Sequence, residues 1–149
     1  VGLGKACELA SKNIALEHTK VAALRDRLEH GIISAVKVAS VNGDIEHRMP
    51  NTSNISFEFI EGESILLLLD EAGICASSGS ACSSGSLEPS HVLRAMGVPF
   101  TRVHGSIRFS LSRYTTDEEI DYAIRVVPEV VSRLQRISPY SDTRRPSEL

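Results

Sequence analysis

Apolar residues in this chain recur with helical spacing near both ends and with strand spacing between them, and this order restricts the folds available to it. The stripe near the start contains Leu3, Ala6, Ala10, Ile14, Val21, Leu24 and Leu28. The stripe near the end contains Ile120, Ala123, Ile124, Val127, Val131 and Leu134. We therefore predict a long amphipathic helix at each end of the chain.

The boundaries of these two helices carry local signals. Gly31 follows the first stripe and predicts that the helix ends there. The second stripe begins after residues 116–119, Thr-Asp-Glu-Glu, which have the form of a capping box. Pro128 lies inside the second stripe, so we expect it to remove a backbone hydrogen bond and to kink or restart the helix.

Two segments after the first helix have strand character. Residues 35–41 are β-prone and end at Asn42-Gly43, a strong turn signal. Residues 55–59 alternate, and the side chains that share their apolar face are Ile55, Phe57 and Phe59. Asn54, just before this run, is interpreted as a turn residue. The sequence thus predicts two strands after the first helix.

A third strand is predicted at residues 106–111. The side chains on its apolar face are Ile107, Phe109 and Leu111. Successive side chains in a strand point to opposite faces, so Arg108 is expected to point away from the core.

Shorter elements fill the remaining positions. We predict a helix at residues 63–72 ended by Gly73, and a short strand at residues 74–76. Pro89 suits the first turn of another helix, which continues through residues 91–96. The order of elements indicates an α+β fold, with a small, largely antiparallel sheet and helices packed on one face.

Composition limits the class of protein. At 149 residues, with 42% hydrophobic and 23% charged residues, the chain suits one globular domain with a tail, and residues 139–149 are predicted to be disordered. A net charge of −3 argues against a nucleic-acid surface. No apolar run approaches the roughly 20 residues of a membrane helix, and we expect a cytoplasmic protein. Because the chain begins with Val1 and not with Met, we expect a fragment of a longer protein.

The three cysteines, Cys7, Cys75 and Cys82, are an odd number without a repeated spacing, which favours free thiols in a reducing compartment. Their spacing does not predict a metal site. Cys7 lies beside the first apolar stripe and Cys75 in the short apolar strand, so we expect both to be packed in the core.

Cys82 lies in a run of ten residues, 77–86, of which eight are Ser or Gly. Such a composition predicts a mobile, accessible loop, which suits a nucleophile that must reach one group and present its cargo to another. From composition alone, a surface loop with an incidental cysteine is the favoured alternative. A phosphate-binding loop is a weaker one, because no Gly-Lys-Ser/Thr follows.

Three strings in the sequence resemble a known family. They are Ser-Ser-Gly-Ser-Ala-Cys at 77–82, Leu-Glu-Pro-Ser-His-Val-Leu-Arg-Ala-Met-Gly at 87–97, and Ser-Ile-Arg-Phe-Ser at 106–110. Together they are similar to the C-terminal part of the NifS/IscS group of pyridoxal-phosphate-dependent cysteine desulfurases. The resemblance runs from about Val1 to about Tyr140, and within the group it is nearest to the NifS branch, which serves nitrogenase maturation.

The resemblance implies the small domain of a fold-type-I pyridoxal phosphate enzyme. Residues 1–30 would be a long helix leading from an absent large domain, and residues 31–138 the small domain, with a nucleophile loop at 77–86. In this family the cofactor labilises a bound L-cysteine, and an enzyme thiolate takes its sulfur as a persulfide and leaves L-alanine. Cys82 matches that thiol, whose ordinary pKa near 8.5 leaves some thiolate at neutral pH.

Three further residues correspond to positions of the family, one closely and two weakly. Arg108 matches the arginine that holds the substrate's α-carboxylate, a task that suits a planar, permanently charged fork. His104 is a possible residue for positioning the Cys82 thiol, and His91 a weaker one, although a lone histidine in such a place is more often a surface residue.

One family feature is missing. The family's Schiff-base lysine follows a histidine, and none of the four lysines, Lys5, Lys12, Lys20 and Lys37, does so. We therefore expect no cofactor-binding residue in this chain and no turnover by the chain alone. The resemblance implies that the full-length protein binds pyridoxal 5'-phosphate, forms a homodimer, uses L-cysteine and delivers sulfur to an iron–sulfur scaffold protein of the NifU/IscU kind.

Two other functions remain open at this point. The domain could be a non-enzymatic sulfur carrier that docks on a scaffold protein through the 77–86 loop and the tail after Pro139. Alternatively, the full-length protein could be a selenocysteine lyase, which shares the same scaffold.

Overall fold

The computed structural model describes residues 1–78 and 89–138. Its elements are α1 (Gly2–Leu16), the π-helical turn η1 (Glu17–Val21), α2 (Ala22–Ala35), β1 (Ala39–Val41), β2 (Thr52–Phe57), α3 (Gly62–Glu71), β3 (Ser77–Ser78), α4 (His91–Ala95), α5 (Phe100–Val103), β4 (Ser106–Ser110) and α6 (Asp117–Ile137). Cys82 and the predicted disordered tail, residues 139–149, lie outside the described residues. None of the described helices is long and apolar enough to cross a membrane.

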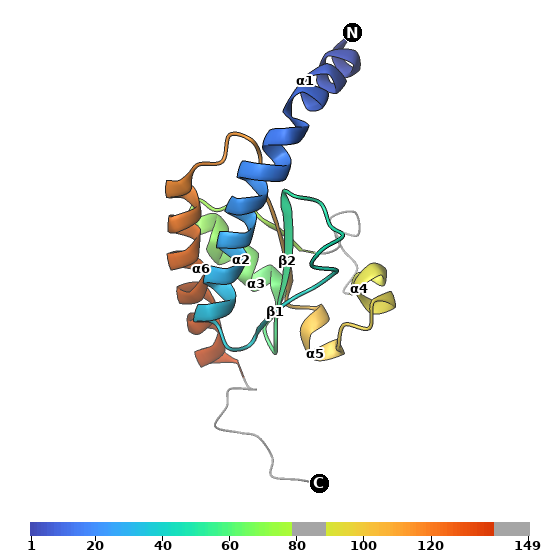
Figure 1. Cartoon of the computed structure of the whole chain (residues 1–149). Coiled ribbons are helices and arrows are strands. Elements are labelled where there is room, and N and C mark those ends of the chain that lie inside the picture. Colours follow the sequence, from blue (N-terminus) through green and yellow to red (C-terminus); the bar gives the residue numbers. More distant parts are fainter. Residues whose placement is uncertain (79–88, 139–149) are drawn as a thin grey trace.

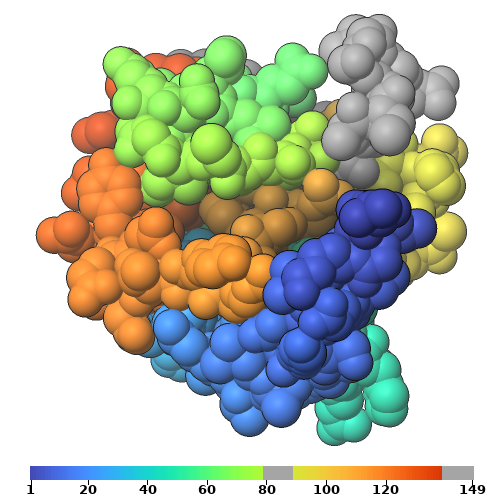
Figure 2. Space-filling view, turned by 90° about the horizontal axis from the view of Figure 1, so that it is seen from above, coloured from blue at the N-terminus to red at the C-terminus, as the bar shows by residue number. Residues whose placement is uncertain are grey.

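The strands form one sheet in the order β1-β2-β4-β3, and every neighbouring pair is antiparallel. The long helices α2 and α6, with α3, pack on one face of this sheet (Figure 1). The short helices α4 and α5 lie on the side opposite α6, and Figure 2 shows the yellow residues of α4 across the molecule from the orange and red residues of α6. The predicted α+β class with a small antiparallel sheet is confirmed.

The core lies between the sheet and the layer of α2, α3 and α6. Ile55, Phe57 and Ile107 of the two central strands are completely buried, as predicted from their alternation. Other completely buried core side chains are Val21, Ile32, Ile65, Leu69, Val127 and Val131. Burying a large aliphatic or aromatic side chain stabilises a fold by about 1.5–3 kcal/mol, so this layer supplies the main driving force for the domain.

The predicted end of the first helix at Gly31 is wrong, because the helix continues to Ala35. Gly31 faces α6, where a Cβ atom would lie only 2.8 Å from side-chain atoms of Ile124. The glycine therefore permits close approach of two helices instead of ending one. Because α2 is longer than expected, β1 starts at Ala39 and not at residue 35. The turn predicted after it is present, with Gly43 at a φ of 101°.

The expected packing of the first half of the long helix is wrong. Helix α1 contains no buried residue, and its apolar side chains are exposed, among them Leu3, Leu9, Ile14 and Leu16. Cys7, expected in the core, is exposed as well. Helix α1 projects beyond the sheet (Figure 1), where the described part of the chain offers it no partner.

Three smaller predictions are corrected near β3, β2 and α4. Residues 74–76 form no strand, and Cys75 is exposed, because pairing with β4 starts only at Ser77. Asn54 lies inside β2, not in a turn. Pro89 precedes the N-cap Ser90 of α4 instead of lying in its first turn.

Two further predictions, on Phe59 and Pro128, differ from the structure. Phe59 leaves β2 with a φ of 62° and is exposed, although we expected it on the apolar face. Helix α6 continues through Pro128, so the predicted restart does not occur. Its capping box is present: the Thr116 hydroxyl accepts a bond from the Glu119 backbone, and the Glu119 carboxylate accepts one from the Thr116 backbone.

A part-buried ion pair ties the connection between β1 and β2 to α2. The Arg48 guanidinium donates to both carboxylate oxygens of Glu29, at 2.7 and 2.9 Å, and the Ser53 hydroxyl donates to Glu29 Oε2 at 2.6 Å. Burial alone would raise the pKa of Glu29. Hydrogen bonds from Arg48 and Ser53, with the charges of Arg48 and Arg25, outweigh it and hold that pKa below its ordinary value.

Candidate functional site

The residue that organises the candidate site is Arg108, in the middle of β4. Its neighbours Ile107 and Phe109 are buried on the core face, so alternation directs Arg108 to the opposite face, as predicted. Arg108 is exposed. Within residues 1–78 and 89–138 its guanidinium makes no hydrogen bond or ion pair with another side chain.

The sheet register places polar residues on both sides of Arg108. Asn54 of β2 is its direct partner on one side, and Ser77 of β3 on the other. Residues directly opposite each other in an antiparallel pair have Cβ atoms about 4.5–5.5 Å apart and share a face. Asn42, just past β1, extends the row, since its backbone N–H donates to the Asn54 carbonyl at 2.8 Å.

The rest of this outer face is polar as well. Its other strand residues are Ser40, Thr52, Ser56, Ser106 and Ser110. None is apolar, although β1, β2 and β4 each contribute apolar residues to the other face. The sheet therefore packs its apolar face against the core and carries hydroxyl and amide groups on the other, where Arg108 and Ser110 are exposed and Ser56 and Ser106 are buried.

Four of these polar groups form a chain of hydrogen bonds with a defined direction. The Ser106 hydroxyl donates to the Arg102 carbonyl at 3.2 Å, so its oxygen is free to accept from Ser56 at 2.7 Å. The Ser56 oxygen in turn accepts from the Asn42 amide at 2.6 Å. The second proton of that amide goes to Asn54 Oδ1, also at 2.6 Å. The buried hydroxyls thus fix how the two amides face each other.

Cys82 belongs to the segment outside the described residues, so its position relative to Arg108 stays a prediction. The strand that precedes it is described: Ser77 and Ser78, expected in the loop, form β3. Ser77 is paired with Arg108. The polypeptide therefore enters the segment that contains Cys82 from the strand next to Arg108.

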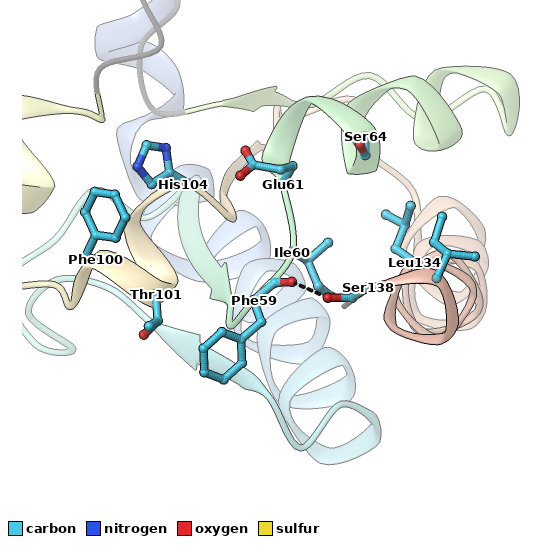
Figure 3. A pocket seen from close by; sticks show the side chains of 10 residues that line it. Phe59, Ile60, Glu61, Ser64, Phe100, Thr101, His104, Leu134 and Ser138 are labelled. Carbon is cyan, nitrogen blue, oxygen red and sulfur yellow. Dashed lines mark hydrogen bonds between the residues drawn. The ribbon is translucent and has the colours of Figure 1, made fainter. Parts of the chain in front are cut away.

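His104 lies in a different place from Arg108. It follows α5 and lines a cavity of about 500 Å³ between the start of α3 and the end of α6, and its ring meets Phe100 edge-on at 4.8 Å. In Figure 3 Glu61 projects into the same space, while Leu134 of α6 closes the far side. His104 Nε2 is buried and has no hydrogen-bond partner in the described part of the chain.

The role of His104 in positioning a thiol stays a prediction, since the described residues near it include no cysteine. His91 is exposed at the start of α4. The structure thus groups Arg108 with Asn42, Asn54 and Ser77, and it does not bring either histidine into that row.

Asn54 and Asn42 are the members of this site that the sequence did not indicate. Extending the alternation of the second strand backwards from Ile55 would have placed Asn54 on the face of Ser56, opposite the core. No signal in the sequence pairs that strand with Arg108, because the partner lies 54 positions further along the chain.

The expectation that this chain carries no covalent pyridoxal phosphate site stays a prediction. All four lysines are exposed, on α1, η1 or the turn after α2. Among residues 1–78 and 89–138, no group of three or more His, Cys, Asp or Glu side chains could hold a metal ion.

The family follows from comparison with known proteins. Residues 1–123 match the model of the aminotransferase class-V family, so the chain belongs to that family, which is pyridoxal-phosphate-dependent. Among its curated relatives, cysteine desulfurase NifS of Azotobacter vinelandii is 60% identical over 148 residues, which are 99% of this chain and 37% of the relative. A cysteine desulfurase of Klebsiella pneumoniae is 56% identical over 98% of this chain and 36% of its own length.

Solved structures agree. A NifS-like protein superposes with a TM-score of 0.74 at 32% identity, over 87% of this chain and 32% of that protein. A NifS-like protein from Rickettsia africae does so with a TM-score of 0.74 at 30% identity, over 88% of this chain and 33% of that protein. The chain thus spans only about a third of the length of the relatives it resembles.

Proposed function

We propose that this chain is the C-terminal, sulfur-accepting part of a cysteine desulfurase, with Cys82 as the nucleophile and Arg108 as the anchor of the substrate's α-carboxylate. The observation that carries the proposal is the position of Arg108, which is exposed on a polar sheet face and has no ion-pair partner among the described residues, next to the strand from which the chain enters the Cys82 segment. The similarity to cysteine desulfurases over nearly the whole chain supports it.

The proposed step is a transfer of one sulfur atom. The Cys82 thiolate attacks the sulfur of bound L-cysteine, an S–S bond forms, and the C–S bond of the substrate breaks with its electron pair left on carbon. That carbon takes up the proton of the substrate thiol, which gives L-alanine and a Cys82 persulfide. No external oxidant or reductant is consumed, because the two electrons that the sulfur loses on forming the S–S bond stay on the substrate carbon, which ends as the methyl group of alanine.

Arg108 binds and orients in this scheme. A guanidinium offers two parallel N–H donors to the two oxygens of a carboxylate, and such charge-assisted pairs are both strong and directional. Holding the carboxylate fixes the substrate relative to the sheet, which limits the positions its sulfur can take. The exposed surroundings of Arg108 allow a small amino acid to reach it.

The labilisation of the C–S bond belongs, in our proposal, to pyridoxal phosphate held by a part of the protein that this chain does not span. None of the four lysines follows a histidine, which supports that division of labour. We further propose that the full-length protein is a cytoplasmic homodimer that delivers sulfur to an iron–sulfur scaffold protein, in the service of nitrogenase metallocluster assembly.

The test is substitution of the nucleophile in the full-length protein. We expect Cys82→Ala to abolish both sulfide release and alanine formation from L-cysteine, with cofactor absorbance unchanged. Cys75→Ala is the matched control, since Cys75 is an exposed free thiol in the same chain that lies outside the proposed site. Unchanged sulfide release by Cys82→Ala would contradict the proposal.

A further inference from the structure

We propose that Asn54 is a second donor to the substrate carboxylate, and that Asn42 is a positioning residue that orients the Asn54 amide. The inference rests on the carboxylate-binding role of Arg108 proposed above and extends it to two residues on neighbouring strands. The observations that carry it are the sheet register and the direction of the hydrogen bonds on the polar face.

Asn54 is close enough to Arg108 to share a small ligand. The two residues are direct partners across β2 and β4, on the outer face of the sheet. At a Cβ separation of about 4.5–5.5 Å, their polar ends can reach the same carboxylate. Two oxygens with about four lone-pair sites can accept the two N–H groups of a guanidinium and still accept a third donor.

The amide of Asn54 has its donors directed toward the ligand side by Asn42. Asn42 Nδ2 carries two protons, and they go to Ser56 Oγ and Asn54 Oδ1, each at 2.6 Å. Since Asn54 uses its oxygen toward Asn42, its Nδ2 group turns away from Asn42. In the described part of the chain that NH₂ group donates to no other residue, so it is available beside Arg108.

Exchanging the oxygen and nitrogen of the Asn42 and Asn54 amides conflicts with the hydrogen bonds of Ser56 and Ser106. With the Ser106 proton on the Arg102 carbonyl, Ser56 donates to Ser106, and the Ser56 oxygen accepts from Asn42. A flipped Asn42 would present its own oxygen to that acceptor. The buried Ser56 and Ser106, with 0% and 1% of their surface exposed, therefore fix Asn42 as a donor and, through it, fix Asn54.

An amide suits this position better than a second cation. It adds a donor without adding a charge that would repel Arg108 across the strand pair. Unlike a carboxylate, it also does not form an ion pair with the guanidinium that the substrate would have to displace. Asn54 would thus contribute to affinity for the carboxylate while leaving the chemistry at sulfur to Cys82.

The test is made in the full-length protein with Asn54→Ala, Asn54→Val and the control Ser110→Ala. Valine suits a strand and keeps β2 intact if alanine does not. Ser110 lies on the same face of β4 as Arg108, two residues further along the strand. We expect either Asn54 variant to raise KM for L-cysteine roughly tenfold with a smaller change in kcat, the size expected for a hydrogen bond to a charged group. Ser110→Ala should leave both KM and kcat within about twofold of the wild-type values.

A carboxylate-specific readout separates binding from a structural role. L-alanine carries the carboxylate and ethylamine does not, so each serves as an inhibitor. We expect the Asn54 variants to weaken inhibition by L-alanine about as much as they raise KM, and to leave inhibition by ethylamine unchanged within about twofold. Equal weakening of both inhibitors would overturn the inference, as would an unchanged KM.

Asn42 is tested by coupling. Asn42→Ala should raise KM by less than the Asn54 variants do, and it should add nothing further in the Asn54→Ala background, because its effect passes through Asn54. Independent, additive effects would overturn its positioning role. Arg108→Ala separates the role inferred for Asn54 from the role proposed for Arg108. If Arg108→Ala raises KM and the Asn54 variants do not, only the inference about Asn54 fails. If Arg108→Ala leaves KM unchanged, the proposed carboxylate anchor fails as well.

Discussion

The Glu29–Arg48 pair offers the sharpest test of how the domain is held together. Glu29→Gln keeps the shape of the side chain but removes the charge, which leaves the Arg48 guanidinium without its main counter-ion. Both side chains are largely shielded from water, with 13% and 14% of their surface exposed. Removing one partner of a fully buried pair costs about 3–5 kcal/mol. Asp26, at 3.5 Å from Arg48, retains part of the compensation, so we expect a loss of about 2–3 kcal/mol.

The assay is urea unfolding of the chain, followed by circular dichroism, for the wild type, Glu29→Gln and Glu8→Gln. Glu8 is the matched control, because it also bonds two cations, Lys5 at 3.0 Å and Lys12 at 2.5 Å, but on the exposed surface of α1. Exposed ion pairs contribute little to stability, and we expect Glu8→Gln to leave the unfolding midpoint unchanged. Equal effects of the two substitutions would refute the reasoning that burial makes the Glu29 pair important.

The same comparison has a pH dependence. The pKa of Glu29 is lowered in the folded state, so its ionised form stabilises the fold fully above its ordinary value of 4.5, and that contribution is lost as pH falls through the lower folded-state pKa. The gap in unfolding free energy between wild type and Glu29→Gln should therefore be constant above that value and close below it. A gap that stays constant down to acid pH would contradict the shift.

Two further substitutions probe the sheet and its arginine. Gly105→Ala should lower the thermal unfolding temperature, at a cost of about 2–3 kcal/mol, because a Cβ atom there would overlap the carbonyl oxygens of Phe57 and Ile60; Gly4→Ala in α1, where nothing lies within 4 Å, should not lower it. Arg108→Lys in the full-length protein should raise KM for L-cysteine with a smaller change in kcat, since an ammonium keeps the charge but loses the two-pronged fork. An unchanged KM would contradict bidentate binding of the substrate carboxylate by Arg108.

The apolar alternation in the sequence was sufficient to predict the faces of the central strands. Ile107 and Phe109 are buried and Arg108 is exposed, as expected, because a period of two leaves no other arrangement once one face is covered. The capping box at Thr116 was also predictable, since both of its bonds are local in sequence. The chemistry of Cys82 came from the resemblance to a family and not from the pattern.

Features that depend on distant neighbours were not predictable. Glycine is a common helix-ending residue, but the role of Gly31 is set by Ile124 on α6, far along the chain. Asn54 resembled a turn residue because its partners, Asn42 and Arg108, are brought to it only by the sheet register. The apolar stripe of α1 correctly indicated a helix, yet burial depends on what packs against it, and the described chain contains no such element.

The central claim is that Cys82 receives the sulfur of L-cysteine, and peptide mapping by mass spectrometry tests it most directly. The full-length protein would be mixed with L-cysteine labelled with a heavy sulfur isotope, quenched with an alkylating reagent after a single turnover, and digested. The account predicts the labelled sulfur, as an alkylated persulfide, on the peptide that contains Cys82, and none on those with Cys7 or Cys75. Label on another cysteine, or alanine formed with no label on Cys82, would contradict it.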